Sequence, residues 1–344
     1  MEGCGKGGPV NIIYASNDGY ACHLGASLCS LLENNRRIPR LDVYVLSVGM
    51  KEEFQKRLQK LGKRYGREVH VVELGDLRGR FPYAVDTRGF DISAMARLFA
   101  PEVLPETVKR ALYLDCDTIV RGSIRRLYRT DLKGSLAGMV MEPTVYEAMR
   151  ESIGFGRDEA YFNSGVILMD LERWRREGTL QTLLDYYRDR GGSLFACDQD
   201  TINGALRGRI LSLEPKYNFF TNYRYFRYGT LKKLCAAYEQ VGPGAFREAK
   251  KNPVIIHYLG DERPWIAGNH NHYRRLYFRY LAKTPWKGIP LVEGKRMYMH
   301  LWWVFNKMTW ICPALRLWIS RRWGMQVIDG RKKKREQEAA GQNG

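Results

Sequence analysis

The sequence lacks a Cys-x-x-Cys pair and any cluster of cysteine and histidine at zinc-binding spacing, although its 344 residues include seven cysteines. An odd number of scattered cysteines is typical of free thiols in a reducing compartment and argues against a disulfide framework. Residues 1–9 are rich in glycine, and they are too short and polar for a secretory signal peptide. We therefore expect a cytoplasmic protein.

A long uninterrupted hydrophobic run is also missing. The most apolar stretch, residues 297–319, is broken by Asn306, Lys307, Pro313 and Arg316, whereas a helix that spans a bilayer needs about 20 consecutive apolar residues. Acidic residues are in deficit, with 37 Asp and Glu against 56 Lys and Arg and a formal net charge of +19. This excess indicates an anionic partner such as a nucleotide, a nucleic acid or a lipid headgroup.

The positive charge is concentrated near the end of the chain. Residues 284–335 contain 12 Lys and Arg but 2 Asp and Glu, and six of the eight tryptophans lie there as well. We expect a body over residues 1–283 and a basic, Trp-rich tail over residues 284–344 that lies on an anionic membrane surface. A chain ending at residue 283 should then stay folded. The alternative is that residues 286–319 pack on the body. A nucleic-acid-binding arm at residues 331–335 is disfavoured by the adjacent tryptophans.

What is present predicts an α/β fold. Hydrophobic residues make up 44% of the chain, and short apolar runs alternate with amphipathic segments in the manner of a Rossmann-like mixed sheet flanked by helices. Strands are predicted at residues 10–15, 41–47, 68–73, 110–114, 136–141, 165–170, 210–213 and 254–257. Helices are predicted at residues 20–32, 51–65, 93–102 (capped by Ser93), 171–190 and 198–206.

Two acidic side chains, Asp115 and Asp117, directly follow a predicted strand. Ligands of open α/β sheets bind beyond the carboxyl ends of strands, and two carboxylates there can hold a divalent ion. His257 follows another strand and precedes Gly260 and Arg263, which could approach and bind phosphate. Carboxylates with an imidazole suit Mn²⁺ better than Mg²⁺. Taken singly, the acidic pair could be a solvated turn, and the histidine could be structural.

Two more polar segments follow in order, YFNSG at residues 161–165 and DQDTIN at residues 198–203. Together with Asn-Asp-x-Tyr after the first strand, LYLDCDT, and HYxGxxRPW, this set resembles glycosyltransferase family 8 over residues 10 to 290. The family includes lipopolysaccharide galactosyltransferases and glucosyltransferases and glycogenin. The resemblance implies a GT-A fold and a retaining transfer of galactose or glucose from a UDP-sugar to a cell-surface glycan or lipid-linked acceptor. It also implies lipopolysaccharide biosynthesis at the inner face of the plasma membrane.

The resemblance assigns roles to residues that would bind the metal, the uridine, the diphosphate or the sugar. Asp115, Asp117 and His257 would ligate Mn²⁺, with Mg²⁺ as the alternative ion. Ala15, Asn17 and Asp18 would line the uridine pocket, Arg97 would reach the donor sugar or diphosphate, and Gly260 and Arg263 would hold the diphosphate. Asn163, Asp198 and Gln199 would contact the sugar, and Glu142 would contact the sugar or the acceptor.

The expected mechanism depends on Gln199, because this neutral amide is a weak nucleophile at the place where a retaining enzyme would use a carboxylate. A front-face reaction is therefore favoured, with Gln199 stabilising positive charge on the sugar. Asp198 is the alternative nucleophile, or a clamp on sugar hydroxyls. The chain departs from the family pattern at Gly89, which stands in place of a phosphate-binding histidine, and at Arg263, which replaces lysine.

Two other functions compete with this hypothesis. A glycogenin-like protein that glucosylates itself would need an acceptor tyrosine and a dimer. A non-catalytic nucleotide- or RNA-binding protein would explain the charge but not the two carboxylate motifs, and we expect no nucleic acid partner. The aromatic run at residues 217–228 is either an acceptor-stacking surface or a loop packed in the core.

Overall fold

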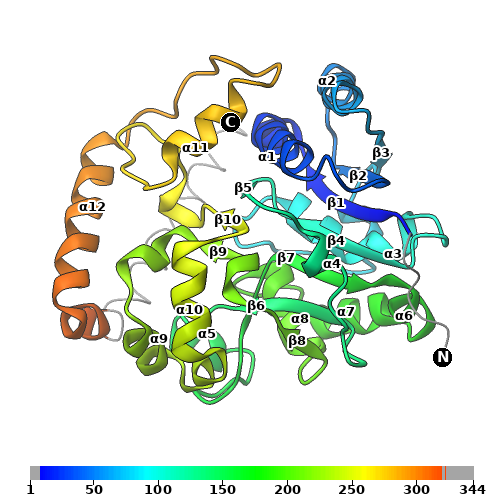
Figure 1. The fold of residues 1–344 in the computed structure, drawn as a ribbon. Coiled ribbons are helices and arrows are strands. Elements are labelled where there is room, and N and C mark those ends of the chain that lie inside the picture. Colours follow the sequence, from blue (N-terminus) through cyan, green and yellow to red (C-terminus); the bar gives the residue numbers. More distant parts are fainter. Residues whose placement is uncertain (1–7, 320–321, 323–344) are drawn as a thin grey trace, which may run out of the picture.

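A computed structural model describes residues 8–319 and residue 322. Its central sheet has seven strands in the order β3-β2-β1-β4-β7-β6-β8 (Figure 1). The strand β7 (Phe162–Asp170) runs antiparallel to both of its neighbours, and the other pairs are parallel. The predicted mixed sheet is therefore confirmed. The remaining strands are β1 (Val10–Ser16), β2 (Leu41–Ser47), β3 (Val69–Glu73), β4 (Arg110–Leu114), β6 (Ala137–Met141) and β8 (Ile210–Ser212).

The central strands form the core of the molecule. Every residue of β1 and β6 is buried, and β7 is buried except at its last residue. Strands covered on both faces read as nearly continuous apolar runs, and the sequences VNIIYAS and AGMVM follow that pattern. This is why the sequence predicted the strands well.

Helices cover both faces of this sheet (Figure 1). On one side, α1 (Ala21–Asn34) packs against α2 (Glu52–Arg64) and α11 (Arg274–Leu281). On the other side lie α7 (Thr179–Arg188) and α8 (Cys197–Ala205). The remaining α-helices are α3 (Ala100–Val103), α4 (Arg125–Tyr128), α5 (Glu147–Glu151), α6 (Leu171–Arg176), α9 (Tyr228–Leu234), α10 (Gly242–Lys251) and α12 (Arg296–Ile311).

A second, smaller sheet joins distant parts of the chain beside the first one. Its middle strand β10 (Ile255–His257) pairs antiparallel with β5 (Thr118–Val120) and parallel with β9 (Phe219–Phe220). The register places His257 opposite Thr118, and the Tyr258 amide donates a hydrogen bond to the Asp117 carbonyl at 3.0 Å. The sheet therefore brings the histidine motif next to the acidic pair.

Two helix predictions were wrong in detail. Residues 93–102 do not form one α-helix: a 3₁₀ helix, η3 (Ile92–Phe99), precedes the short α3. The side chain that caps it belongs to Asp91, whose Oδ1 accepts from the Ser93 amide at 2.9 Å, so Ser93 is not the cap. Residues 171–190 form two helices, α6 and α7, because Gly178 adopts a left-handed conformation with φ of 62°.

The six cysteines that the structure describes are all free thiols, as the sequence predicted, and five of them are buried. Within residues 8–319, no helix has the length and apolar character that crossing a membrane requires. The basic run at residues 331–335 and Trp323 lie outside the described residues.

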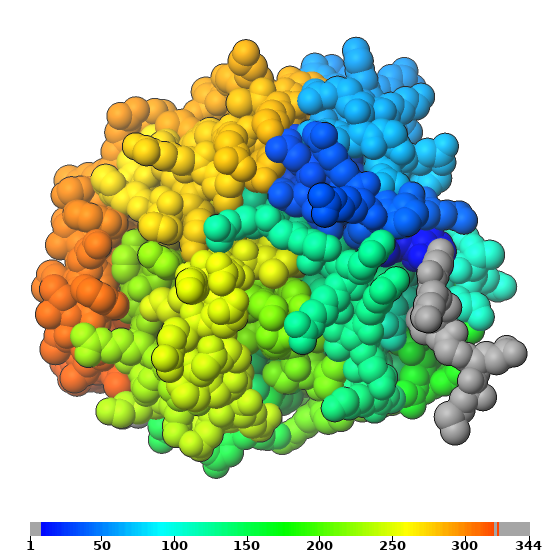
Figure 2. All heavy atoms as spheres, in the orientation of Figure 1, coloured from blue at the N-terminus to red at the C-terminus, as the bar shows by residue number. Residues whose placement is uncertain are grey.

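The first part of the predicted tail packs on the body, as the alternative expectation held. Trp286 is buried over Gly25 of α1, where a Cβ atom would come within 2.7 Å of the indole ring. Met299 and Asn306 of α12 are also buried. In the space-filling view, α12 forms an orange ridge along one side of the molecule (Figure 2). The division at residue 283 stays a prediction, but these contacts tie the two parts together.

Candidate active site

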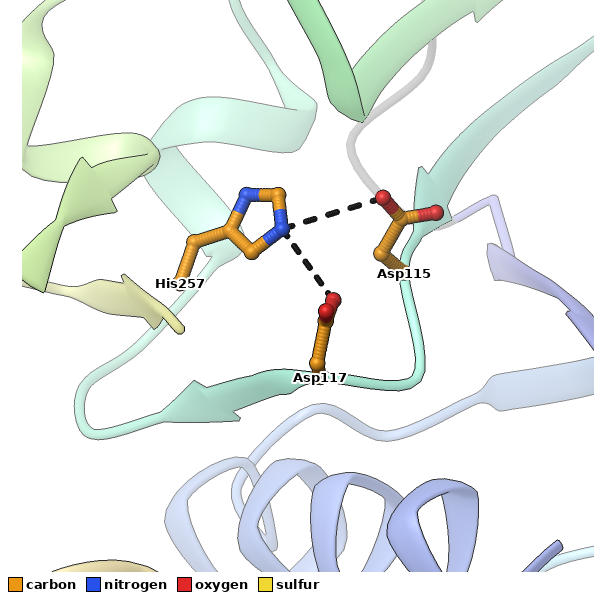
Figure 3. A group of neighbouring side chains, drawn as sticks. All are labelled: Asp115, Asp117 and His257. Atoms are coloured by element: carbon orange, nitrogen blue, oxygen red, sulfur yellow. Dashed lines mark ion pairs between the residues drawn. The ribbon is translucent and has the colours of Figure 1, made fainter. Parts of the chain in front are cut away.

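Three side chains predicted as metal ligands meet at the ends of adjacent strands (Figure 3). Asp115 follows β4, Asp117 precedes β5, and His257 ends β10. The Nε2 atom of His257 lies 3.1 Å from Asp117 Oδ1 and 3.8 Å from Asp115 Oδ2. One ligand atom from each residue falls within 4.8 Å of the others. This donor set, two carboxylates and an imidazole, fits a divalent cation.

The glycine of the YFNSG motif leaves room for this cluster. A Cβ atom on Gly165 would come within 2.2 Å of His257 Cε1 and 2.8 Å of Asp115 Oδ2. Any side chain here would displace the imidazole or the carboxylate. Glycine is therefore required at this position for a steric reason, to leave space for the side chains of the Asp-Asp-His cluster.

The orientation of His257 is fixed from the side opposite the carboxylates. Its Nδ1 atom lies 3.0 Å from Asn218 Oδ1, and the amide of Asn218 donates in turn to Asn163 Oδ1 at 2.8 Å. Because the Asn218 oxygen can only accept, His257 must donate from Nδ1, which leaves Nε2 free to bind a metal.

The charged groups of the cluster shift one another's pKa values. Burial would lower the pKa of His257, but Asp117 and Asp115 raise it above its ordinary value. Burial would also raise the pKa of Asp117, but His257 and Arg263 hold it at about 2. The carboxylates therefore favour the protonated form of His257, and a bound cation would compete with that proton.

A second polar group continues from Asn163. Its amide nitrogen donates to Glu142 Oε2 at 2.9 Å and to Gln199 Oε1 at 3.0 Å. Gln199 also accepts from the Ser164 amide, and it donates from Nε2 to Glu142 and to the Tyr161 hydroxyl, both at 3.2 Å. These bonds hold the Gln199 amide as a fixed dipole. The structure thus brings three predicted sugar-contacting residues together.

Arg97 connects the metal cluster to Asp198. This arginine is buried, with Nη2 at 2.9 Å from Asp115 Oδ1 and Nε at 3.2 Å from Asp198 Oδ2. Its Nη1 atom donates to the Ser164 carbonyl. Burial raises the pKa of Asp198 to about 6, against the opposing effect of Arg97. The Oδ2 atom of Asp198 is therefore held in an ion pair by Arg97.

Arg263 borders the cluster on its other side. Its Nη2 atom lies 3.4 Å from Asp117 Oδ2, and its guanidinium is near the rings of Tyr20 and Trp265. Its Nε atom is buried without a hydrogen-bond partner in the described part of the chain. A buried donor is costly to leave unpaired, so this nitrogen fits a site for an anion.

The predicted uridine-contacting residues lie where β1 ends. The Ala15 carbonyl accepts from the Cys116 thiol at 3.2 Å, which puts it beside the acidic pair. Asn17 caps the turn that follows by accepting from the Tyr20 amide, and Asp18 accepts from the Lys51 amide.

Gly260 begins the 3₁₀ turn after His257 with φ of 54°. A Cβ atom there would meet no protein atom within 4 Å, so the positive φ is the structural reason for glycine at this position.

The model of glycosyl transferase family 8 matches residues 11–268. The chain belongs to glycosyltransferase family 8. Every predicted site residue falls inside the matched span.

Curated relatives cover most of this chain. General stress protein A of Bacillus subtilis is 28% identical over 283 residues, which are 81% of this chain and 96% of that protein. The lipopolysaccharide 1,2-glucosyltransferase of Escherichia coli K12 is 27% identical over 301 residues, 85% of each chain. The lipopolysaccharide 1,3-galactosyltransferase of Salmonella typhimurium is 23% identical, covering 82% and 81% of the two chains.

Solved structures confirm the GT-A fold of this family 8 chain. The galactosyltransferase LgtC, crystallised with donor and acceptor sugar analogues, superposes with a TM-score of 0.67 at 23% identity, over 80% of this chain and 96% of that one. The glycosyltransferase GlyE of Streptococcus pneumoniae TIGR4 superposes with a TM-score of 0.57 at 21% identity, over 87% of this chain and 64% of the GlyE chain.

Sequence reasoning missed three contributors to the glycosyltransferase site. Asn218 was hidden in the aromatic run, and its only signal was a polar side chain among apolar ones. Tyr161 and Gly165 stood inside a recognised motif without an assigned role. The aromatic run itself packs in the core, since Tyr217, Phe219, Phe220, Tyr223 and Phe226 are all buried.

Proposed function

We propose that this family 8 glycosyltransferase transfers galactose or glucose from a UDP-sugar to a glycan or lipid-linked acceptor, with Mn²⁺ held by Asp115, Asp117 and His257. The observation that carries the proposal is the Asp-Asp-His cluster beside the unpartnered Nε atom of Arg263. A metal ligand set next to a buried cationic donor matches a diphosphate leaving group. When bound, the ion would neutralise charge on that leaving group.

The metal is proposed to be Mn²⁺, with Mg²⁺ as a weaker substitute. Magnesium prefers an all-oxygen shell in octahedral geometry, whereas the cluster supplies the imidazole nitrogen of His257. Arg263 would hold the diphosphate next to the ion, and Ala15, Asn17 and Asp18 would contact the uridine.

The configuration at C1 is proposed to be retained because the acceptor attacks the same face of the sugar that the diphosphate leaves. The C1–O bond to the diphosphate breaks, and the acceptor oxygen bonds to C1 from the same side while a departing phosphate oxygen takes the hydroxyl proton. All four hydrogen bonds of the Gln199 side-chain amide go to protein groups. This arrangement suits Gln199 as a fixed dipole that stabilises positive charge on the sugar. It suits Gln199 less well as a nucleophile. Asp198, which Arg97 holds in place, would accept from a sugar hydroxyl.

The acceptor is proposed to be presented at an anionic membrane surface, as it is for an enzyme of lipopolysaccharide assembly on the cytoplasmic face. Two relatives are a lipopolysaccharide 1,2-glucosyltransferase and a lipopolysaccharide 1,3-galactosyltransferase. On α12, Met297, Leu301, Met308 and Ile311 are exposed by 78%, 59%, 53% and 70% and share one face of the helix. An apolar stripe on a basic segment is typical of a helix that lies in a membrane interface.

A panel of UDP-sugars with Mn²⁺, scored for UDP release, tests the proposal. We expect turnover of UDP-galactose or UDP-glucose, and we expect Asp115→Asn or Asp117→Asn to lower it by at least about 10³-fold, because each removes an anionic metal ligand. Asp189→Asn, at an exposed ion pair on the surface, is the matched control and should be fully active. Silence across the whole panel, or full activity of either cluster variant in EDTA, would contradict the proposal.

A further inference from the structure

The segment between β10 and α11 carries part of the proposed donor site. This donor loop, residues 258–273, starts directly after His257 and includes Arg263, whose guanidinium is beside Asp117. One side of the loop therefore faces the metal cluster. The position of Arg263 depends on what supports the other side.

Residues 286–302, the start of the predicted tail, support that other side. The Val292 amide donates to the Trp265 carbonyl, and the Val292 carbonyl accepts from the Ala267 amide, both at 2.9 Å. A Cβ atom on Gly268 would come within 2.8 Å of the Arg296 Cα atom. The start of α12 therefore packs directly on the backbone of the donor loop.

Two tail side chains bond to the acidic residues that precede Arg263. Trp302 Nε1 donates to Glu262 Oε1 at 3.1 Å, and the Tyr298 hydroxyl donates to Asp261 Oδ2 at 3.0 Å. Glu262 is 5% exposed, and its second oxygen accepts from Asn271 Nδ2 at 3.0 Å. In the described part of the chain, no cation lies within ion-pair distance of Glu262. A buried carboxylate held by neutral donors depends strongly on each of them.

We propose that Trp302 and Glu262 are positioning residues of the donor site: the indole N–H of Trp302 fixes Glu262 and thereby the adjoining Arg263. The inference rests on the proposed function only for the identity of the ligand, the diphosphate of a UDP-sugar. Neither residue touches the metal cluster, so their effect on the donor passes through the loop backbone. The inner side of α12 is thus part of the donor site, although the sequence places it in the tail.

Trp302→Phe is the sharpest test, because it keeps most of the ring packing and removes the N–H donor. Trp310→Phe is the matched control, since Trp310 lies on the same helix and is 43% exposed. Hydrogen exchange of the amides of residues 258–273 is measured on full-length, metal-free protein. UDP binding with Mn²⁺ is measured by calorimetry, and the donor KM and kcat are measured where turnover is found.

We expect Trp302→Phe to speed amide exchange in the donor loop and to weaken UDP binding about five- to tenfold, because part of the free energy of one hydrogen bond to a buried charged group reaches the donor site through the loop. The donor KM should rise, while kcat should stay within about twofold of the wild-type value, because the lost support acts on donor binding. Glu262→Gln should speed exchange of the same amides. Trp310→Phe should change neither amide exchange, UDP affinity, KM nor kcat.

Wild-type exchange and wild-type UDP affinity in Trp302→Phe would overturn the proposal. A lower melting temperature with unchanged loop exchange and donor KM would also overturn it, because it would show a purely structural role. The exchange measurement does not depend on turnover. If the wild-type protein releases no UDP and binds none, the proposed function fails, while the exchange result still decides whether Trp302 positions the loop.

Discussion

His257 can bind a metal only through an unprotonated Nε2 atom, and a single neighbour sets which nitrogen carries the proton. Asn218 accepts from Nδ1 and is itself held by Asn163. Asn163 also contacts Glu142 and Gln199, so one chain of hydrogen bonds runs from the Asp-Asp-His cluster to the residues predicted to contact the sugar. A change at Asn218 would therefore act on metal affinity without removing a ligand.

We predict that Asn218→Ala weakens Mn²⁺ binding about 10- to 100-fold, the usual effect of removing the partner that orients a metal-bound histidine. Titration calorimetry of the metal measures it. Asn252→Ala is the control, because Asn252 is exposed at the end of α10. An unchanged affinity in Asn218→Ala would show that the orientation of His257 is set by other contacts.

Gln199 is predicted to act on the reacting sugar and not on donor affinity. Gln199→Ala should lower turnover about 10²- to 10³-fold, as expected when one preorganised polar contact to the transition state is lost. UDP binding should stay close to that of the wild type. Normal turnover would remove Gln199 from the site, and a sugar trapped on Asp198 by mass spectrometry would replace the front-face mechanism with a covalent one.

Among the elements, α12 differs most from its sequence-based interpretation. Its inner face carries Met299, Asn306 and Thr309, which are buried, and its outer face carries the exposed apolar stripe. The sequence shows apolar residues all around this helix, so it cannot tell which side packs on the body. The contacts to Gly268 and Glu262 help to identify the side that packs on the body.

This packing reverses the expected effect of cutting the chain after Lys283. The cut would remove Trp286, which fills the space over Gly25, and Val292, which pairs with the donor loop. Loss of a buried tryptophan alone costs about 3–5 kcal/mol. We predict that the shortened protein is insoluble, or that its melting temperature, followed by circular dichroism, is well below that of the wild type.

A soluble truncated chain with the wild-type melting temperature and normal UDP-sugar hydrolysis would contradict that expectation. It would restore the interpretation of residues 284–344 as a separate unit. Trp310→Ala serves as the control, since removing an exposed ring should change stability by no more than about 0.5 kcal/mol.

Much of the fold and site could be predicted because the signals are local. The apolar runs predicted the central strands. The motifs predicted the three metal-binding side chains, which the structure brings together as expected. Asn218 and Trp302 could not be found in this way, because each acts on a residue about 40 positions away in the sequence and no spacing links the two. The capping role of Asp91 was missed because Ser93 is an equally good cap by residue type.

For the whole molecule, we propose that one side of α12 supports donor binding and the other contacts the membrane. The double variant Leu301→Asp, Ile311→Asp changes only the exposed stripe. We predict that it loses salt-sensitive binding to anionic vesicles in co-sedimentation but keeps UDP-sugar hydrolysis, because charged side chains oppose burial at the interface.

The matched control for that variant is Lys60→Gln, Lys63→Gln on α2, which lowers the net charge by the same two units at exposed positions elsewhere. Equal vesicle binding by both variants would show that net charge alone brings the protein to the membrane. Undiminished binding by the stripe variant would remove α12 from the contact.

The central claim is retaining transfer from a UDP-sugar at the Asp115–Asp117–His257 cluster. Proton NMR can follow the protein with Mn²⁺ and UDP-α-galactose or UDP-α-glucose in water, before the released sugar mutarotates. The account predicts that UDP appears together with the α-anomer of the free hexose, and that Asp117→Asn produces neither. A first-formed β-anomer would contradict retention, and the absence of any hexose from either donor would contradict the proposed activity.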